Sequence, residues 1–279
     1  MNRCYGVIDG DRRQAKLVRL LRADGRKTVT YGLDCWIPGE IGSLEEAAAA
    51  NVVILPLPLC MEEGVLNCGG EPITTRDLFE QLRPGQRILA GQVKETQFRE
   101  AAKCGIKLTD YFAREELTVA NAAATAEAAI QVAMERLERM LLGMPCLVLG
   151  FGRIGKLLSH RLHGMGAAVT ATARRTEDLA WIRAYGYRAL RTNELSGKLS
   201  EFGLIFNTIP SQILDSDLLA QLPEDCICID LASWPGIDPD AAKKQGVCLI
   251  WARGLPGRMV PYSAAEIIRD TVYHILSEE

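Results

Sequence analysis

A short apolar run, three spaced glycines and a helical pattern follow one another at residues 146–162, and this succession permits few folds. Cys146 to Leu149 reads as a buried strand, and the apolar positions after Arg153 repeat at helical spacing. Glycines also mark ordinary turns, but between a strand and a helix the pattern Gly-x-Gly-x-x-Gly favours a dinucleotide site, with the pyrophosphate on the helix amino terminus. The cofactor-binding residues predicted here are Gly150, Gly152, Arg153, Ile154 and Gly155.

Strand and helix signals alternate along the whole chain, which is typical of parallel α/β sheets. In the first half, strand signals lie at residues 5–8, 28–31, 52–57, 87–90 and 106–108. In the second half they lie at residues 146–149, 168–172, 187–190, 203–207, 226–230 and 248–252, the number of strands expected of a complete Rossmann domain. An alanine-rich segment at 117–142 reads as one long linking helix, and 263–276 reads as a terminal helix.

We therefore predict an α/β protein with two doubly wound parallel-sheet domains, the second of them a Rossmann dinucleotide-binding domain. The expected organisation is a flavodoxin-like substrate domain at 1–118, a linking helix at 119–143, the Rossmann domain at 144–260 and a C-terminal helix at 261–279 that packs back on the first domain. A domain without a nucleotide fingerprint joined to one that has it is typical of an enzyme with its substrate in a cleft.

The end of the strand at 168–173 indicates which dinucleotide is bound. An NAD site usually places Asp or Glu there, to bind the ribose 2′-hydroxyl. This chain has Arg174 and Arg175 instead, and guanidinium groups suit a 2′-phosphate. We predict NADP, with NAD as the alternative, and Thr172, Arg174 and Arg175 as cofactor-binding residues. Two solvated arginines at a strand end are the structural alternative.

Composition limits the partners and the location. Of 279 residues, 48% are hydrophobic and 24% are charged, as in ordinary soluble proteins. The net charge of −3 gives no general attraction to nucleic acid or to an anionic membrane. The apolar run at 52–61 is too short to span a bilayer, and the amino terminus has no secretory signal pattern. Nine cysteines without a Cys-x-x-Cys pair favour reduced thiols in a cytoplasm and no metal site. A homodimer is the default expectation.

Polar segments follow several strands at their carboxyl ends, where open α/β sheets bind ligands. After the first strand, Asp11 precedes Arg12 and Arg13; the arginines either grip carboxylates or face water while Asp11 caps the helix. The segment after the fourth strand of the second half suits a loop under the nicotinamide ribose, or is a plain turn. It supplies the predicted cofactor ligands Asn207, Thr208, Ile209 and Pro210. Ser233, Arg253 and Arg258 follow the last two strands.

A proton acceptor is harder to find. His160 and His163 fall toward the far end of the helix after the glycines, and His274 lies near the carboxyl terminus, so we expect all three at the surface. That removes the histidine acid–base of 2-hydroxyacid dehydrogenases. Glu127, early in the linking helix, is the best-placed carboxylate, with a solvated helix acid as the alternative.

Taken together, these segments resemble one family, the A subunits of dipicolinate synthase, over nearly the whole chain. The similar segments are Gly10 to Gln14, Thr125 to Glu127, Leu149 to Gly155, Asn207 to Ser211, Asp230 to Gly236 and Gly254 to Gly257. The last two are the most specific, because the glycine loop and Asn-Thr-x-Pro occur in many dehydrogenases. The chain departs from the family pattern at Trp234 and Ile237, where Arg and Gly are usual.

The resemblance implies oxidation of dihydrodipicolinate to dipicolinate, a B subunit similar to flavoprotein decarboxylases, and expression in the mother-cell cytoplasm of a sporulating bacterium. For a cyclic dicarboxylate substrate, Arg12, Arg13, Arg253 and Arg258 are candidate carboxylate clamps, Ser233 a further substrate-binding residue, and Glu127 or Asp11 the catalytic base. Two alternatives remain open: an oxidoreductase similar to 2-hydroxyacid dehydrogenases that acts on another small carboxylate, and a non-catalytic nucleotide-binding scaffold or redox sensor for a partner.

Overall fold

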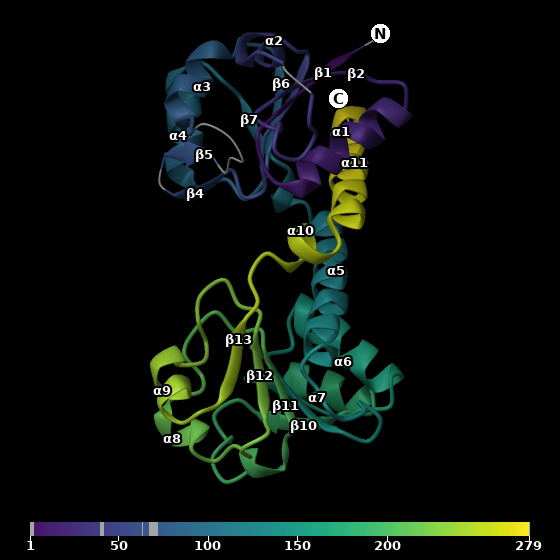
Figure 1. The fold of residues 1–279 in the computed structure, drawn as a ribbon, viewed down its shortest axis with the longest axis vertical. Helices are drawn as coiled ribbons and strands as arrows, with labels where there is room; N and C mark the ends of the chain where they lie inside the picture. Colours follow the sequence, from purple (N-terminus) through teal and green to yellow (C-terminus); the bar gives the residue numbers. More distant parts are fainter. Residues whose placement is uncertain (1–2, 40–41, 63, 67–71, 279) are drawn as a thin grey trace. The chain divides into compact units, whose positions relative to one another are not determined.

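The computed structural model describes residues 3–39, 42–62, 64–66 and 72–278. The chain forms two compact units, drawn in Figure 1. The first unit contains Met1–Asn121 and Pro256–Glu279, and the second contains Ala122–Leu255. Helix α5 (Glu115–Met134) begins in the first unit and continues in the second.

The first unit is built on a parallel sheet of five strands in the order β2-β1-β3-β6-β7. This is the strand order of flavodoxin-like doubly wound folds. The central strands are apolar and buried, as expected of parallel strands covered on both faces. The strands are β1 (Cys4–Ile8), β2 (Lys27–Tyr31), β3 (Val52–Ile54), β6 (Arg87–Ala90) and β7 (Leu108–Asp110).

Helices cover both faces of this sheet (Figure 1). One core contains side chains of α1 (Arg12–Ala23) and of the C-terminal helix α11 (Pro261–Ser277). The other core contains side chains of α2 (Leu44–Ala48), α3 (Thr75–Gln81) and α4 (Glu95–Lys103). The predicted packing of the C-terminal helix on the first domain is confirmed, and Tyr273 of α11 donates to Asp24 at 2.9 Å.

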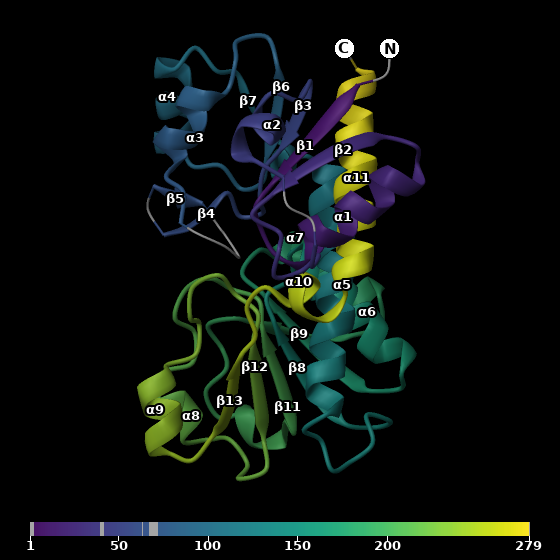
Figure 2. The same ribbon diagram turned by 45° about the horizontal axis from the view of Figure 1, so that its top comes forward.

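The second unit has a parallel sheet of six strands in the order β10-β9-β8-β11-β12-β13. Numbered from β8, this is the Rossmann order 3-2-1-4-5-6, so the predicted fold class is confirmed. The strands are β8 (Pro145–Leu149), β9 (Ala168–Ala173), β10 (Arg188–Arg191), β11 (Leu204–Asn207), β12 (Ile227–Asp230) and β13 (Cys248–Trp251). Figure 2 shows α6 (Arg153–Gly164) on one side of these strands, and α8 (Ser216–Leu219) and α9 (Pro239–Lys244) on the other. The β9–β10 connection is α7 (Thr176–Ala184), and η2 (Leu199–Glu201) precedes β11.

Three elements differ from the sequence prediction. The linking helix ends at Met134 rather than at Leu142, because the following side chains are largely exposed and packing no longer supports a helix. A hairpin, β4 (Cys60–Glu62) and β5 (Val65–Leu66), follows β3 where no strands were expected. Past the last strand, α10 (Leu255–Met259) is a short helix where no element was predicted. A single 3-10 turn, η1 (Tyr111–Ala113), follows β7.

Candidate functional site

The glycine loop of the second unit has the shape that a pyrophosphate requires. A Cβ added to Gly155 would overlap the carbonyl oxygen of Gly150, so only glycine lets α6 approach the loop this closely. A Cβ added to Gly152 would meet no atom of the described residues within 4 Å, which leaves open space at the start of α6. No described side chain caps the helix at Gly152. Backbone N–H groups at an open helix amino terminus fit a bound phosphate, so these residues fit a dinucleotide.

Two threonines support this loop. The Gly150 N–H donates to Oγ1 of Thr172 at 3.1 Å, and Oγ1 of Thr208 donates to the Leu149 carbonyl at 2.8 Å. Thr172 is fully buried and also accepts a hydrogen bond from Thr192. Thr172, which the sequence indicated as a cofactor ligand, therefore supports the loop from within the protein.

A buried carboxylate joins the loops after β11 and β12. Oδ1 of Asp230 accepts from Nδ2 of Asn207 at 2.8 Å and from the Ala232 N–H at 3.0 Å. Oδ2 accepts from the N–H groups of Gly236 at 2.7 Å and Ile237 at 3.1 Å. The Asn207 amide in turn holds the backbone of Ile209 through both its atoms. Asn207 and Asp230 therefore fix the shape of the Asn-Thr-Ile-Pro and Asp-Leu-Ala-Ser-Trp-Pro-Gly segments at the carboxyl edge of the sheet.

The two arginines after β9 have different surroundings. Arg175 is exposed and pairs with Asp178 at 3.1 Å and, more distantly, with Glu177 at 3.9 Å. Arg174 is exposed and makes no ion pair with any residue that the structure describes. Of the two, Arg174 is the one whose guanidinium has no carboxylate to leave before binding a phosphate.

In the first unit, Asp11 and Arg13 form an ion pair at the start of α1. Asp11 caps the helix by accepting from the Arg13 N–H at 2.8 Å, and Oδ2 lies 2.7 Å from Nη2 of Arg13. The same Nη2 donates to the carbonyl of Leu57, after β3, and the Arg13 side chain is only 9% exposed. Nearby, Tyr111 donates to the Leu55 carbonyl, and complete burial raises the pKa of its hydroxyl far above the ordinary value. Arg13 therefore serves the internal structure of this edge, and Asp11 caps the helix.

The Gly-Leu-Pro-Gly segment meets this ion pair from the other end of the chain. A Cβ on Gly257 would lie 2.8 Å from Oδ2 of Asp11 and 2.9 Å from Nε of Arg13, closer than side chains normally approach. Arg12 donates to the carbonyl of Arg258 at 3.1 Å. Gly257 and Arg258 are thus packed against the start of α1 in the first unit.

The proposed bases are both engaged in ion pairs. Glu127 on α5 is 62% exposed and accepts from Nη2 of Arg161 on α6 at 2.9 Å. Arg161 lies about two helical turns beyond the glycine loop, so the pair stands away from the start of α6. His160 and His163 are exposed on α6, and His274 of α11 lies 3.3 Å from carboxylates of Glu116 and Glu278.

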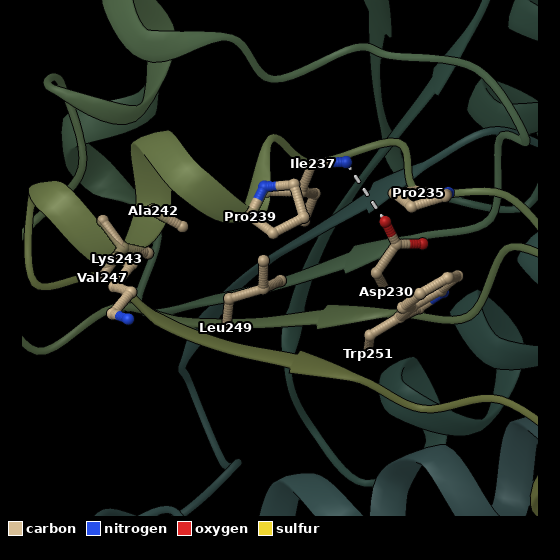
Figure 3. A pocket seen from close by; sticks show the side chains of 9 residues that line it. All are labelled: Asp230, Pro235, Ile237, Pro239, Ala242, Lys243, Val247, Leu249 and Trp251. Atoms are coloured by element: carbon tan, nitrogen blue, oxygen red, sulfur yellow. Dashed lines mark hydrogen bonds between the residues drawn. The ribbon is translucent and has the colours of Figure 1, made fainter.

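The remaining predicted substrate residues of the second unit follow β12 and β13. Ser233 and Trp234 lie in the loop that Asp230 holds, and Trp234 is 71% exposed. Arg253 stacks on Trp251. Figure 3 shows Trp251 at one end of a pocket of about 350 Å³ between β13 and α9, with Lys243 at the other end. Its lining is mainly apolar, and the Asp230 carboxylate at its edge is turned toward the Ile237 N–H.

Sequence reasoning missed several residues at the carboxyl ends of strands, in each of the two units. Asp230 was named only as the first residue of a motif, without a role, and Trp251 was not singled out, although a carboxylate at a strand end and an indole beside arginine are visible signals. Asp9 and Gln92, at the carboxyl ends of β1 and β6, adopt φ angles of 60° and 55°, which non-glycine residues rarely do. Residues with such rare backbone conformations are found more often at functional sites than elsewhere.

Among the described residues, no cluster of His, Cys, Asp or Glu could hold a metal ion. Within the same part of the chain, no helix combines the length and the apolar character needed to cross a membrane.

Comparisons with known proteins agree on one relationship. The family model for the N-terminal domain of the dipicolinate synthase A subunit matches residues 5–112. The A subunit of dipicolinate synthase from Bacillus subtilis (strain 168) is 28% identical over 282 residues, covering 98% of this chain and 95% of the relative. The crystal structure of the same subunit from Bacillus halodurans superimposes with a TM-score of 0.88 at 26% identity, covering 100% of this chain and 99% of that one. D-lactate dehydrogenase from Escherichia coli shares the fold, with a TM-score of 0.61 at 15% identity over 98% of this chain and 95% of that one.

The two doubly wound sheets and the open glycine loop define an α/β protein whose second unit has a Rossmann fold with a loop that fits a dinucleotide. Over nearly its whole length the chain is similar to the A subunits of dipicolinate synthase, as the resemblance of its motifs predicted.

Proposed function

We propose that this protein oxidises dihydrodipicolinate to dipicolinate with a nicotinamide dinucleotide as the hydride acceptor. The observation that carries this proposal is the similarity to dipicolinate synthase A subunits over nearly the whole chain. The open glycine loop supports it, because it offers the dinucleotide site that such an oxidation needs.

The chemistry removes two hydrogens from the ring. One ring carbon loses a hydride, which takes both electrons of its C–H bond to the acceptor. A second ring position loses a proton, and the electron pair that this proton leaves behind completes the aromatic pyridine. When bound, the nicotinamide supplies the hydride acceptor. Because aromatisation favours the product, the chain needs to position the ring more than it needs a strong acid–base pair.

Two loops of the second unit would bind different parts of the dinucleotide. Gly150, Gly152 and Gly155 would hold the pyrophosphate at the start of α6, together with the backbone of Arg153 and Ile154. The loop of Asn207 to Pro210, fixed by Asp230, would line the nicotinamide ribose.

We propose that arginines bind the substrate carboxylates, with Ser233 as a further polar contact. Arg12, Arg253 and Arg258 remain predicted clamps, whereas Arg13 would have to leave Asp11 and the Leu57 carbonyl to bind an anion. Glu127 and Asp11 stay the predicted bases, and proton transfer to either needs its ion pair to open.

We propose NADP as the preferred cofactor, with Arg174 as the contact to the 2′-phosphate. Arg175 would join it on release from Asp178. NAD remains the alternative.

We further propose that a flavoprotein-like B subunit is the partner, since the relatives are by name the A subunits of an enzyme. The expected setting is the mother-cell cytoplasm of a sporulating bacterium, and the expected assembly of this chain is a homodimer.

The test mixes the purified chain with NADP or NAD and freshly generated dihydrodipicolinate, alone and with a B subunit. Reduced nicotinamide and the ultraviolet band of the pyridine dicarboxylate are recorded together. We expect both signals to rise in equal amounts, and faster with NADP. Cofactor binding without either signal, alone and with the B subunit, would refute the enzyme and favour the scaffold alternative.

A further inference from the structure

At the carboxyl end of β13, the guanidinium of Arg253 lies over the indole of Trp251. We call this pair the Trp251–Arg253 platform. The indole Nε1–H of Trp251 donates to the Ala232 carbonyl at 3.0 Å, which fixes the ring against the loop after β12. The guanidinium carbon of Arg253 lies 5.0 Å from the centre of that ring, within cation–π distance. The indole is 41% exposed, so this platform lies at the surface of the second unit.

The backbone around the pair is fixed as well. The Ala252 N–H donates to the Asp230 carbonyl at 2.8 Å, and the Asp230 carboxylate accepts from the Ala232 N–H at 3.0 Å. Asp230 therefore fixes the backbone on both sides of the pair: the end of β13, which leads to Arg253, and the loop whose carbonyl accepts from Trp251. Such support holds a long arginine side chain in place before a ligand arrives, which reduces the entropy lost on binding.

Strand order places this platform on the nicotinamide side of the sheet. The glycine loop follows β8, and the loop after β9 meets the adenosine ribose. Because β11, β12 and β13 lie on the opposite side of β8 from β9, their loops lie toward the nicotinamide half of an extended dinucleotide. A cation here is placed to meet a substrate rather than a cofactor phosphate.

We propose that Arg253, held by Trp251, binds one ring carboxylate of the substrate, and that Trp251 is its positioning residue. This inference rests on the proposed function. A guanidinium stacked on an indole presents its N–H edge to a planar carboxylate, and that edge can form two parallel hydrogen bonds. The arrangement therefore suits one carboxylate group of the substrate.

The test uses product binding to the full chain with NADP present, by isothermal titration in metal-free buffer. Pyridine-2,6-dicarboxylate is compared with pyridine-2-carboxylate. For Arg253→Gln we expect the dicarboxylate to bind about ten- to a hundredfold more weakly, so that its preference over the monocarboxylate is largely lost. Trp251→Leu should weaken it about three- to tenfold, and Arg253→Lys should restore only part of the affinity. Arg183→Gln, an exposed arginine on α7, is the matched control and should change nothing.

The outcomes separate this inference from the proposed function. If the wild type prefers the dicarboxylate and Arg253→Gln keeps that preference, the assignment of Arg253 is wrong while the proposed function stands. If the wild type binds neither compound, both fail. Arg253 is exposed, so its variants should fold, and unchanged NADP binding by each variant confirms an intact second unit.

Discussion

The carboxylate of Asp230 is the group whose removal has the most clearly defined cost. Asp230 is 1% exposed and accepts hydrogen bonds from Asn207 and from three backbone N–H groups. A hydrogen bond to a charged group contributes about 1.5–3 kcal/mol. Since all of these bonds share one carboxylate and are not additive, we expect Asp230→Ala to lower the free energy of unfolding of the second unit by about 3–5 kcal/mol.

Asp230→Asn should cost less, about 2–3 kcal/mol, because an amide keeps one acceptor but turns an NH₂ group toward backbone donors. Asp215→Ala is the control: this exposed carboxylate caps α8 through the Leu218 N–H at 3.0 Å, and its loss should cost about 1 kcal/mol.

The assay combines urea unfolding with hydrogen exchange of the 231–237 peptide, because two units need not unfold together. We expect the amides of Gly236 and Ile237 to lose protection in Asp230→Ala while those of the first unit keep it. The assigned role of Asp230 is refuted if Asp230→Ala costs no more than Asp215→Ala and both amides stay protected.

Three further changes have predicted outcomes. Gly155→Ala should destabilise the protein by about 1–3 kcal/mol and weaken NADP binding, measured by thermal unfolding and calorimetry, because its methyl group overlaps the Gly150 carbonyl. Arg174→Ala should lower NADP affinity about tenfold and leave NAD affinity unchanged, and an equal loss for both would contradict the 2′-phosphate assignment. Arg114 lies 2.6 Å from Glu278 and holds the pKa of that carboxyl below its ordinary value of 4.5. This stabilising contribution is present above that value and is lost as the pH falls through the lowered pKa, so Glu278→Gln should flatten the acid side of the stability curve.

The positions of most strands could be predicted because each is a short apolar run bounded by turn residues. The helix at 261–277 was predictable for a different reason: its buried side chains repeat at helical spacing. The length of the linking helix was not, because the sequence after Met134 contains good helix formers and only the absence of packing ends the helix there.

The part of the candidate site that could be predicted is the part formed by the backbone of a single segment, the glycine loop. The conformation of the glycine loop depends on the glycines themselves, so it could be predicted from the sequence. Gly155, for example, packs against the backbone of Gly150 so closely that no side chain fits. The surroundings of Glu127 were not predictable, because its partner Arg161 lies 34 residues further on and meets it only through the packing of α5 and α6. The burial of Thr172 was not predictable for a related reason: its position at a strand end was correct, but its burial depends on how the glycine loop folds over it.

The most direct test of the proposed function follows the transferred hydrogen. Dihydrodipicolinate carrying deuterium on its ring carbons is mixed anaerobically with the protein, NADP and the B subunit, and the nicotinamide and the product are analysed by mass spectrometry. We predict deuterium in the reduced nicotinamide in an amount equal to the dipicolinate formed, and less of both products with the Gly155→Ala variant, whose NADP binding is weakened. Dipicolinate that forms at the same rate without NADP, or reduced nicotinamide without deuterium, would contradict hydride transfer from the substrate ring to the nicotinamide.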